Sequence, residues 1–276
     1  MHLICIYEWL FSVERSRAAQ ILSWAYAVGM LVVLYLPLLP PLATSVSPTG
    51  RQPDLSDFTL KWYTQLSTNQ TLVSSIETSA IVAALTGLFT PLLALCAAMA
   101  VRELRIPRIV LLLLLLPLFI PGVSLGLANA FLFQQLGIFP SIGTITIVHV
   151  LWALPFAFLI VLTAMSTFDP RYLEAAYVHG AGRLRAFLNV ELPLIWPGVM
   201  GSATFSVILS FNETVRTNLV QGPFNTVQTY VWSRYLQVGL TPQIYALMSA
   251  MIVLTLLLIG VLLVYNLRRK RGASGG

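Results

Sequence analysis

The sequence predicts an all-α membrane protein with six transmembrane helices. Of its 276 residues, 57% are hydrophobic and only 9% are charged, whereas soluble domains carry about 25% charged residues. The mean hydropathy is +0.82, which is far above that of a water-soluble chain. A spanning helix needs about 20 mostly apolar residues, and uncharged runs of this length recur along the chain. The aromatic content of 11% excludes a disordered or low-complexity protein.

The charge-free runs define the individual helices. Residues 109–168 contain no charged residue and are long enough for two helices. The segment 134–137, Gln-Gln-Leu-Gly, marks the turn between them, with Pro140 following. Pro117 and Pro121 should kink the first of these two helices, so that it is not a straight span. The six predicted helices are 19–42, 72–100, 108–132, 142–167, 192–212 with an extension to about 219, and 235–267.

The distribution of basic residues predicts the orientation. Twelve of the 16 Lys and Arg residues fall in alternate segments, around 15–17, 102–108, 171–185 and 268–271. Cytoplasmic loops of membrane proteins collect Lys and Arg, so these segments and both termini are assigned to the cytoplasm. The same rule explains the net charge of +6 without a nucleic-acid partner. The predicted parts are a cytoplasmic N-terminal segment 1–18, a transmembrane domain 19–267 and a basic cytoplasmic tail 268–276.

The cytoplasmic loop 168–198 is the most informative segment. It begins with Asp169-Pro170, a helix N-cap followed by proline at the first helical position, and its short helix should stop at Gly180. This helix is amphipathic, so it lies on lipid or docks into the groove of a partner. Its small residues favour docking, because burial in lipid prefers large side chains. One apolar face is formed at i, i+3 and i+4 by Leu173, Ala176 and Tyr177.

The residues of this loop resemble the EAA loop of the permease subunits of binding-protein-dependent ABC importers. The family pattern is matched at every spacing by Glu174-Ala175-Ala176, Gly180-Ala181, Phe187, Val190, Leu192-Pro193 and Pro197-Gly198. One departure is Gly182-Arg183, where a Ser-Pro pair is common. The resemblance implies the type I ABC importer permease fold and a coupling helix that docks into a cleft of an ATPase subunit. The ATPase-coupling residues that it implies are Glu174, Ala175, Ala176, Tyr177, Gly180 and Ala181.

The resemblance also implies the partners of the chain. They are an ABC ATPase dimer, a second permease subunit that is a different chain, and a periplasmic substrate-binding protein, assembled in a bacterial inner membrane. The chain has no G-x4-G-K-[ST] phosphate loop, and neither Lys61 nor Lys270 follows a glycine. We therefore expect a transport subunit that is not an enzyme, with no catalytic residue, cofactor or metal of its own. ATP and Mg would be bound by the partner ATPase subunits.

The C-terminal third resembles more narrowly the second permease of spermidine/putrescine importers. The matching residues are Ser210-Phe211-Asn212-Glu213, Gly222-Pro223, Thr226, Tyr230, Gly239, Thr241-Pro242, Ile244 and Ala246-Leu247. This resemblance implies transport of a polyamine or a similar small organic cation. Related importers of ferric ion, thiamine, phosphonates or amino-acid derivatives remain alternatives, because the branch has two carboxylates where this chain has Asn212-Glu213. A secondary transporter or channel is the rival from another class, but paired Gly/Pro-broken helices in repeated halves do not occur.

The candidate substrate path centres on Glu213. A charge at the bilayer centre costs about 2.5–3.5 kcal/mol on insertion scales, so this carboxylate either faces a wet cavity or pairs with Arg216 at i+3 near the outer surface. His149 is a second candidate, although a lone histidine on a helix is more often a packing residue. Trp232 is expected in the loop before the last helix, as part of an aromatic belt or as a lip of the cavity. The full path as predicted comprises Glu213, Asn212, Phe211, His149 and Trp232.

The pair Gly122 and Gly126 has the spacing that lets a helix approach another helix closely. Such a match is common by chance in an apolar run. It predicts that the helix kinked by Pro117 and Pro121 contacts another helix closely at these two glycines.

The six-span topology predicts opposite labelling of two single cysteines in a background without Cys5 and Cys96. A cysteine at Arg183 should react with a membrane-impermeant maleimide only after the membrane is permeabilised, because it belongs to a basic cytoplasmic loop. A cysteine at Ser56 should react in intact spheroplasts. Labelling of both positions from one side would contradict the count of six crossings.

Overall fold

The chain is all-helical throughout the part that the computed structural model describes, residues 17–49, 58–103 and 107–273. Side chains are described within these ranges except at 17–18, 107–108 and 258–273. The predicted N-terminal segment 1–18 therefore lies almost wholly outside the described residues, and of the predicted tail 268–276 only the backbone of 268–273 is described, as the end of α14. The chain divides into two compact units, one formed by residues 67–239 and the other by 1–66 with 240–276.

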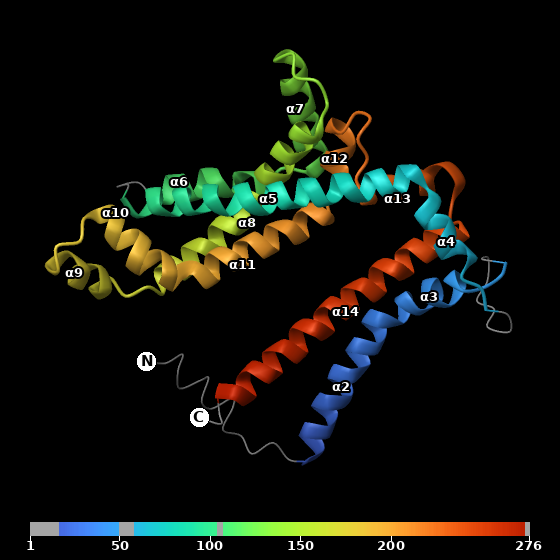
Figure 1. Ribbon diagram of the computed structural model, residues 1–276, viewed down its shortest axis with the longest axis horizontal. Helices are drawn as coiled ribbons and strands as arrows, with labels where there is room; N and C mark the ends of the chain where they lie inside the picture. The colour runs from blue at the N-terminus through green and yellow to red at the C-terminus, as the bar shows by residue number, and fades with distance from the viewer. Residues whose placement is uncertain (1–16, 50–57, 104–106, 274–276) are drawn as a thin grey trace. The chain divides into compact units, whose positions relative to one another are not determined.

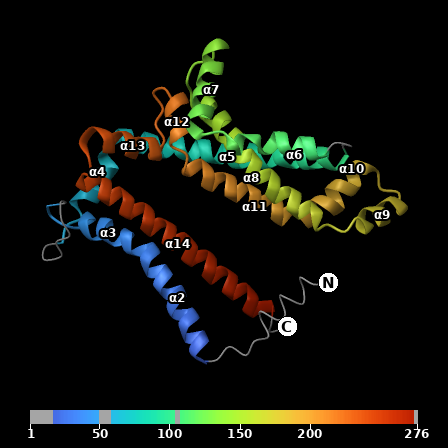
Figure 2. The same cartoon turned by 180° about the vertical axis from the view of Figure 1, so that it is seen from behind.

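Three long helices form the centre of the unit 67–239. They are α5 (Gln70–Glu103), α8 (Ile142–Ser166) and α11 (Leu192–Phe211), and they lie side by side in both views (Figures 1 and 2). Their bounds match the predicted helices 72–100, 142–167 and 192–212 to within about three residues. At one end, alanines 94, 98 and 157 pack with Val101, Phe158 and Val161, all buried. Since each helix is apolar along its whole length, packing rather than an apolar stripe selects the inner face.

Small residues form that inner face. On α5, buried small side chains recur about every fourth residue, and on α11 serines repeat at the same interval. Side chains four apart share one face of a helix, and small side chains there let helix backbones approach closely. The α5 positions are Ser75, Ser79, Thr86, Thr90, Ala94 and Ala98, and the α11 positions are Ser202, Ser206 and Ser210.

The predicted kink at Pro117 and Pro121 is confirmed, and it is larger than a kink. The chain runs through α6 (Pro107–Leu115), a 3-10 turn η2 (Leu116–Phe119) and α7 (Gly122–Gln135), and the two parts are bent by 102°. Proline removes a backbone donor and clashes with the preceding turn, so two prolines four apart end one helix and start another. The straight helix 108–132 is therefore two helices, and α7 stands across the bundle in Figure 1.

The predicted ends of the last two helices are wrong. The helix expected to run to about 219 ends at Phe211, and α12 (Val215–Val220) is separate. The helix expected from 235 begins at Pro242, as α14 (Pro242–Ala273), after a separate α13 (Val227–Val238). Gly239 at φ +73 ends α13, and Thr226 caps its start by accepting a hydrogen bond from the backbone N–H of Thr229. These local end signals override the continuous hydrophobicity.

The second unit contains α2 (Arg17–Tyr35), the 3-10 turn η1 (Leu36–Leu38), α3 (Leu39–Ser45) and α14, while α4 (Lys61–Thr68) crosses the boundary between units. The prolines at 37, 40 and 41 explain why the predicted helix 19–42 is divided. α3 packs against α14, and the Ser249 hydroxyl donates to the Pro41 carbonyl over 3.1 Å.

The described residues contain four helices long and apolar enough to cross a membrane, or five if the bent pair α6–α7 is one span. The sixth predicted span falls on α14, of which only Pro242–Leu257 is described with side chains, as a shorter apolar helix. The total of six spans and the cytoplasmic location of both termini stay predictions.

Gly198 tests the close packing of α8 and α11. A Cβ atom there would overlap the Cβ of Ala164, which has no freedom to rotate away, whereas a Cβ at Gly201 would lie 3.9 Å from Ile160. We expect Gly198→Ala to lower the free energy of unfolding by about 1–3 kcal/mol, the usual cost of overpacking. Thermal unfolding of the detergent-solubilised protein measures this. Gly201→Ala is the matched control and should behave like the unaltered chain; equal destabilisation by both would contradict the packing.

Candidate functional site

The short helix α9 (Arg171–Val178) begins one residue later than the sequence predicts. Pro170 precedes the helix rather than occupying its first position, with φ −59 and ψ −21. The N-cap is Pro170 and has no side-chain cap; one residue earlier, the carboxylate of Asp169 accepts a hydrogen bond from the backbone N–H of Arg171 at 3.0 Å. The predicted N-cap at Asp169 is therefore wrong by one residue, although Asp169 still hydrogen-bonds to the backbone at the helix start.

The predicted helix end at Gly180 is confirmed. Gly180 has φ +81, and its N–H donates to the carbonyl of Tyr177 at 2.9 Å. The N–H of Ala181 donates to the carbonyl of Ala176 at 3.0 Å. These two bonds together form a Schellman motif, which favours glycine at the left-handed position. The backbone leaving α9 therefore has a single, well-defined direction.

The face of α9 that packs inward differs in part from the predicted apolar face. Leu173 and Ala176 are half-buried, and α9 packs against the helical turn Phe187–Glu191. Tyr177 is 46% exposed, and Glu174 and Ala175 are exposed as well. The exposed face thus presents a carboxylate, a methyl group and an aromatic ring to a potential partner.

The loop joins the bundle through an uninterrupted helical stretch. α10 (Arg183–Ala186) continues through one π-helical turn, η3 (Phe187–Glu191), into α11. Pro193 has no N–H to donate and its ring crowds the residue four positions earlier, which explains the wider turn just before it. Pro197 lies inside α11. The stretch 183–211 is therefore a continuous helical lever with one widened turn just before Pro193.

One ion pair connects this lever to α5. The guanidinium of Arg102 donates a hydrogen bond to the carboxylate of Glu191. The side chain of Glu191 is only 2% exposed, and that of Arg102 is 41% exposed. Loss of Arg102 would leave the buried carboxylate of Glu191 without a counterion, which is destabilising, so this pair constrains the geometry at the end of the bundle.

A second ion pair lies where α11 passes into α12. Glu213 and Arg216 are each 6% exposed, and Nη1 of Arg216 lies 2.6 Å from Oε2 of Glu213. The other carboxylate oxygen accepts the backbone N–H of Arg216 at 2.9 Å. The i+3 pairing, one of the two alternatives that the sequence left open, is therefore formed, but the pair is buried in the protein rather than exposed at a surface.

Trp152 and two glycines complete the surroundings of Arg216. The guanidinium carbon lies 3.8 Å from the centroid of the Trp152 ring, a cation–π contact. Added Cβ atoms at Gly122 and Gly126 would lie 3.1 Å from the guanidinium and 2.6 Å from Leu219. The predicted close approach of the Gly122–Gly126 helix is therefore confirmed, and its partner is α12.

His149 is a hydrogen-bonded packing residue in the same region. Its Nδ1 lies 2.8 Å from the Ser210 hydroxyl, and its Nε2 lies 2.7 Å from the Thr217 hydroxyl. Thr217 donates its own proton to the carbonyl of Glu213, so it accepts from Nε2–H, and Nδ1 accepts from Ser210. This network fits the neutral ring and connects α8, α11 and α12.

The other predicted path residues lie outside this buried cluster. Asn212 is exposed and donates from its side chain to the carbonyl of Ile208, and Phe211 is 40% exposed. Trp232 is 49% exposed and lies on α13, not in a loop, with its ring beside Tyr235. The structure thus brings Glu213 and His149 together and leaves the remaining three at separate exposed positions.

Comparisons with known proteins identify the family. Residues 91–272 match the family described as the binding-protein-dependent transport system inner membrane component. The chain belongs to this permease family. The match confirms the class predicted from the EAA loop and favours an importer subunit over a secondary transporter or channel.

Relatives and solved structures are similar along most of the permease. The spermidine/putrescine transport system permease protein PotC of Escherichia coli (strain K12) is 26% identical, over 87% of this chain and 92% of PotC. The putrescine transport system permease protein PotI of the same strain is 24% identical, over 81% and 84%. The structure of a bacterial ABC transporter involved in the import of alginate matches with a TM-score of 0.67 at 17% identity, over 92% of this chain and 98% of that chain. The predicted importer permease fold is therefore confirmed.

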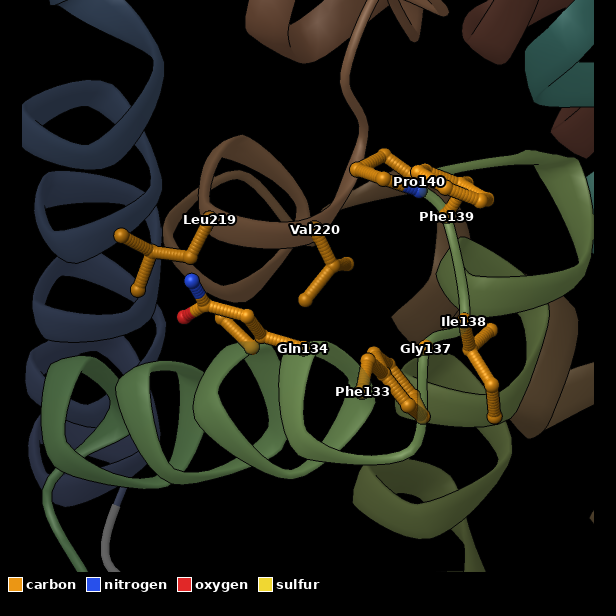
Figure 3. Close-up of a pocket in the computed structure, with 9 residues that line it drawn as sticks. Phe133, Gln134, Gly137, Ile138, Phe139, Pro140, Leu219 and Val220 are labelled. Carbon is orange, nitrogen blue, oxygen red and sulfur yellow. The ribbon is translucent and has the colours of Figure 1, made fainter.

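The permease also has a hollow of about 280 Å3 between the end of α7, the following turn and α12. Figure 3 shows Leu219 and Val220 of α12 pointing toward Phe133 and Gln134 of α7. The turn lies where the sequence predicts it, with Gly137 at φ +68. Apart from the amide of Gln134 the lining side chains are apolar, so this hollow is not suited to bind a cation.

Glu191 and Trp152 are the residues that sequence reasoning missed in the permease. A usable signal existed for Glu191, which is the only acidic residue between Ala175 and Asn212 and directly precedes an uncharged run. No comparable signal existed for Trp152, because a tryptophan in an apolar helix has many possible neighbours. Its contact with Arg216 depends on how α8 and α12 pack.

Proposed function

We propose that this permease serves an ATP-driven importer of a polyamine or a similar small organic cation. The observation that carries the substrate class is the similarity to PotC over 87% of the chain, with PotI as a second relative named for putrescine. Other cations and small organic substrates remain alternatives, because this chain has one carboxylate, in Asn212-Glu213, where the polyamine branch typically has two. Uptake of labelled putrescine, measured with the neighbouring transport components present, tests the substrate class.

The proposed assembly contains a second permease, two ATPase subunits and a periplasmic substrate-binding protein. A structure with an alginate-bound periplasmic protein matches the chain with a TM-score of 0.67, which supports this kind of assembly through the shared fold. ATP and Mg would be bound by the ATPase subunits on the cytoplasmic side. Closure of the ATPase dimer would displace α9, and the continuous stretch 183–211 would carry the displacement into the membrane.

The exposed face of α9 is the proposed ATPase contact. The defined end at Gly180 and the hydrogen bond at Asp169 hold the helix in one conformation. Displacement of α9 would therefore move the attached helices instead of deforming α9 itself. Glu174, Ala175 and Tyr177 are exposed on α9 and available for docking.

Glu213 is the charged member of the proposed substrate path. Its carboxylate already has Arg216 as a counterion, so a cationic substrate would meet it by competing with the guanidinium. One further feature supports a cation site here: the Trp152 ring, whose face attracts cations, lies against the guanidinium and would be available to a cation that displaces it. Asn212, Phe211 and Trp232 would line exposed parts of the path, and His149 would hold α12 in place behind it.

Gly180 tests the coupling role of α9. An L-residue at φ +81 costs about 1–2 kcal/mol, so Gly180→Ala should loosen the helix end, and Gly180→Val more so. We expect weaker co-purification of the ATPase subunits and reduced transport, with normal membrane insertion. Gly182→Ala is the matched control, since Gly182 has φ −69 and both glycines have open space around them. Normal substrate-stimulated ATP hydrolysis in the Gly180→Val complex would exclude this role.

Glu213 and Arg216 together test the cation path. If substrate uses this carboxylate, Glu213→Gln should reduce putrescine uptake per assembled complex by at least about tenfold, as loss of a charge-assisted hydrogen bond of about 1.5–3 kcal/mol would. Complex yield should also fall, because Arg216 is then buried without its counterion. Arg216→Ala leaves a buried carboxylate without a counterion, at a cost of about 3–5 kcal/mol, and should reduce complex yield.

The isolated binding protein is the control for both variants, because its affinity belongs to another chain and should not change. Full uptake by the Glu213→Gln variant would remove this residue from the path. Loss of complex yield in both variants, with normal uptake per assembled complex in the Glu213→Gln variant, would assign the pair a structural role only.

A further inference from the structure

The Arg102–Glu191 ion pair has no role in the cation path or in the exposed face of α9, yet it occupies a mechanically important position. Glu191 is the last residue of the π-helical turn Phe187–Glu191. That turn packs against α9 and α10 and continues directly into α11. Glu191 is therefore located where the loop motion enters the bundle, and its partner is on a different helix, 89 positions away in the sequence.

The other contacts described between α5 and α11 are van der Waals contacts of apolar and small side chains, with no further ion pair between the two helices. Where the two helices approach most closely, a Cβ added at Gly87 would lie 2.5 Å from the Val207 side chain. An apolar groove of about 570 Å3 also runs between them, lined by residues of both helices including Pro91 and Trp196. Van der Waals contacts between helices permit small sliding movements, the basis of shear motions. They would not by themselves force α5 to follow α11.

An ion pair with a buried carboxylate constrains such sliding. Within the described residues it is the only ion pair between different helices, since the other two are Arg102–Glu103 and Glu213–Arg216. Separating the charges would leave the carboxylate of Glu191 without a counterion in a site where its side chain is 2% exposed. We therefore expect α5 and the turn Phe187–Glu191 to move together, with the ion pair intact.

We propose that Arg102 and Glu191 are positioning residues that tie α5 to the EAA loop, so that displacement of α9 moves α5 together with α11. The proposal rests on the proposed ATP-driven function. In it, one coupling loop drives two membrane helices, α11 through the continuous chain and α5 through the ion pair.

Two cysteine reporters in the assembled complex test the tie. The reporter positions are Ile76 on α5 and Ile208 on α11. They are matched, because both are isoleucines and both are 49% exposed. Each is changed to cysteine singly, in a permease without Cys5 and Cys96, and maleimide labelling is compared with and without ATP plus vanadate. In the unaltered pair we expect ATP to change the labelling rate at both reporters.

Glu191→Gln should abolish the response at Ile76→Cys and preserve it at Ile208→Cys. This variant is mild, because glutamine keeps the shape and the freed Arg102 side chain is 41% exposed and can hydrate. Glu103→Gln is the control, since Glu103 is beside the same arginine with a side chain 75% exposed, and both responses should remain. Arg102→Lys keeps the opposite charge and should retain the response on α5.

Several outcomes would overturn the tie. They are loss of both responses in the Glu191→Gln variant, preservation of both, or a lack of response at Ile76→Cys in the unaltered pair. If the Glu191→Gln complex does not assemble, the Arg102→Lys complex provides the test. Lysine keeps the opposite charge, so the ATP response at Ile76→Cys should remain. Loss of that response in the Arg102→Lys complex would contradict the proposal. The labelling uses no substrate, so a wrong substrate class leaves the result unaffected. Silence of both reporters in the unaltered complex would refute ATP-driven coupling and the tie with it.

Discussion

Close contact among α5, α8 and α11 is the constraint on which the rest of the permease depends. Small residues on α5 and α11 allow it, and Gly198 lies directly against Ala164. Lipid provides little hydrophobic driving force between helices, so packing of small residues determines which helices associate. With this contact formed, the ends of the three helices have defined positions. The loop 168–198 at one end and α12 at the other are thereby placed relative to the bundle.

Several buried polar and charged side chains within this bundle have partners on another helix. His149 hydrogen-bonds to α11 and α12, and the pairs Glu213–Arg216 and Arg102–Glu191 are held at opposite ends of α11. Unpaired charges in such an environment are costly, so each pair also restricts how the helices can move. In a transporter this is useful, because the same contacts that stabilise one conformation determine which segments move together in another.

The coupling loop and the buried cluster differ in how they relate to function. α9 is built from local signals, a carboxylate at its start and a left-handed glycine at its end, and its outer face remains exposed for a partner. The Glu213 cluster is assembled from α8, α11 and α12, with Gly122 making room for the guanidinium. One site is a rigid surface offered outward, and the other is an internal charge pair that substrate would have to open.

The sequence by itself determined the all-helical membrane class, the helices α5, α8 and α11, the bend at Pro117 and Pro121, and the helix end at Gly180. Each of these depends on hydrophobicity or on the backbone preferences of proline and glycine, which act locally. Only the tertiary structure decided where α11 stops, that Trp232 lies on a helix, and that Arg102 meets Glu191. Continuous hydrophobicity does not mark helix ends, and contacts between residues 89 positions apart depend on how whole helices pack.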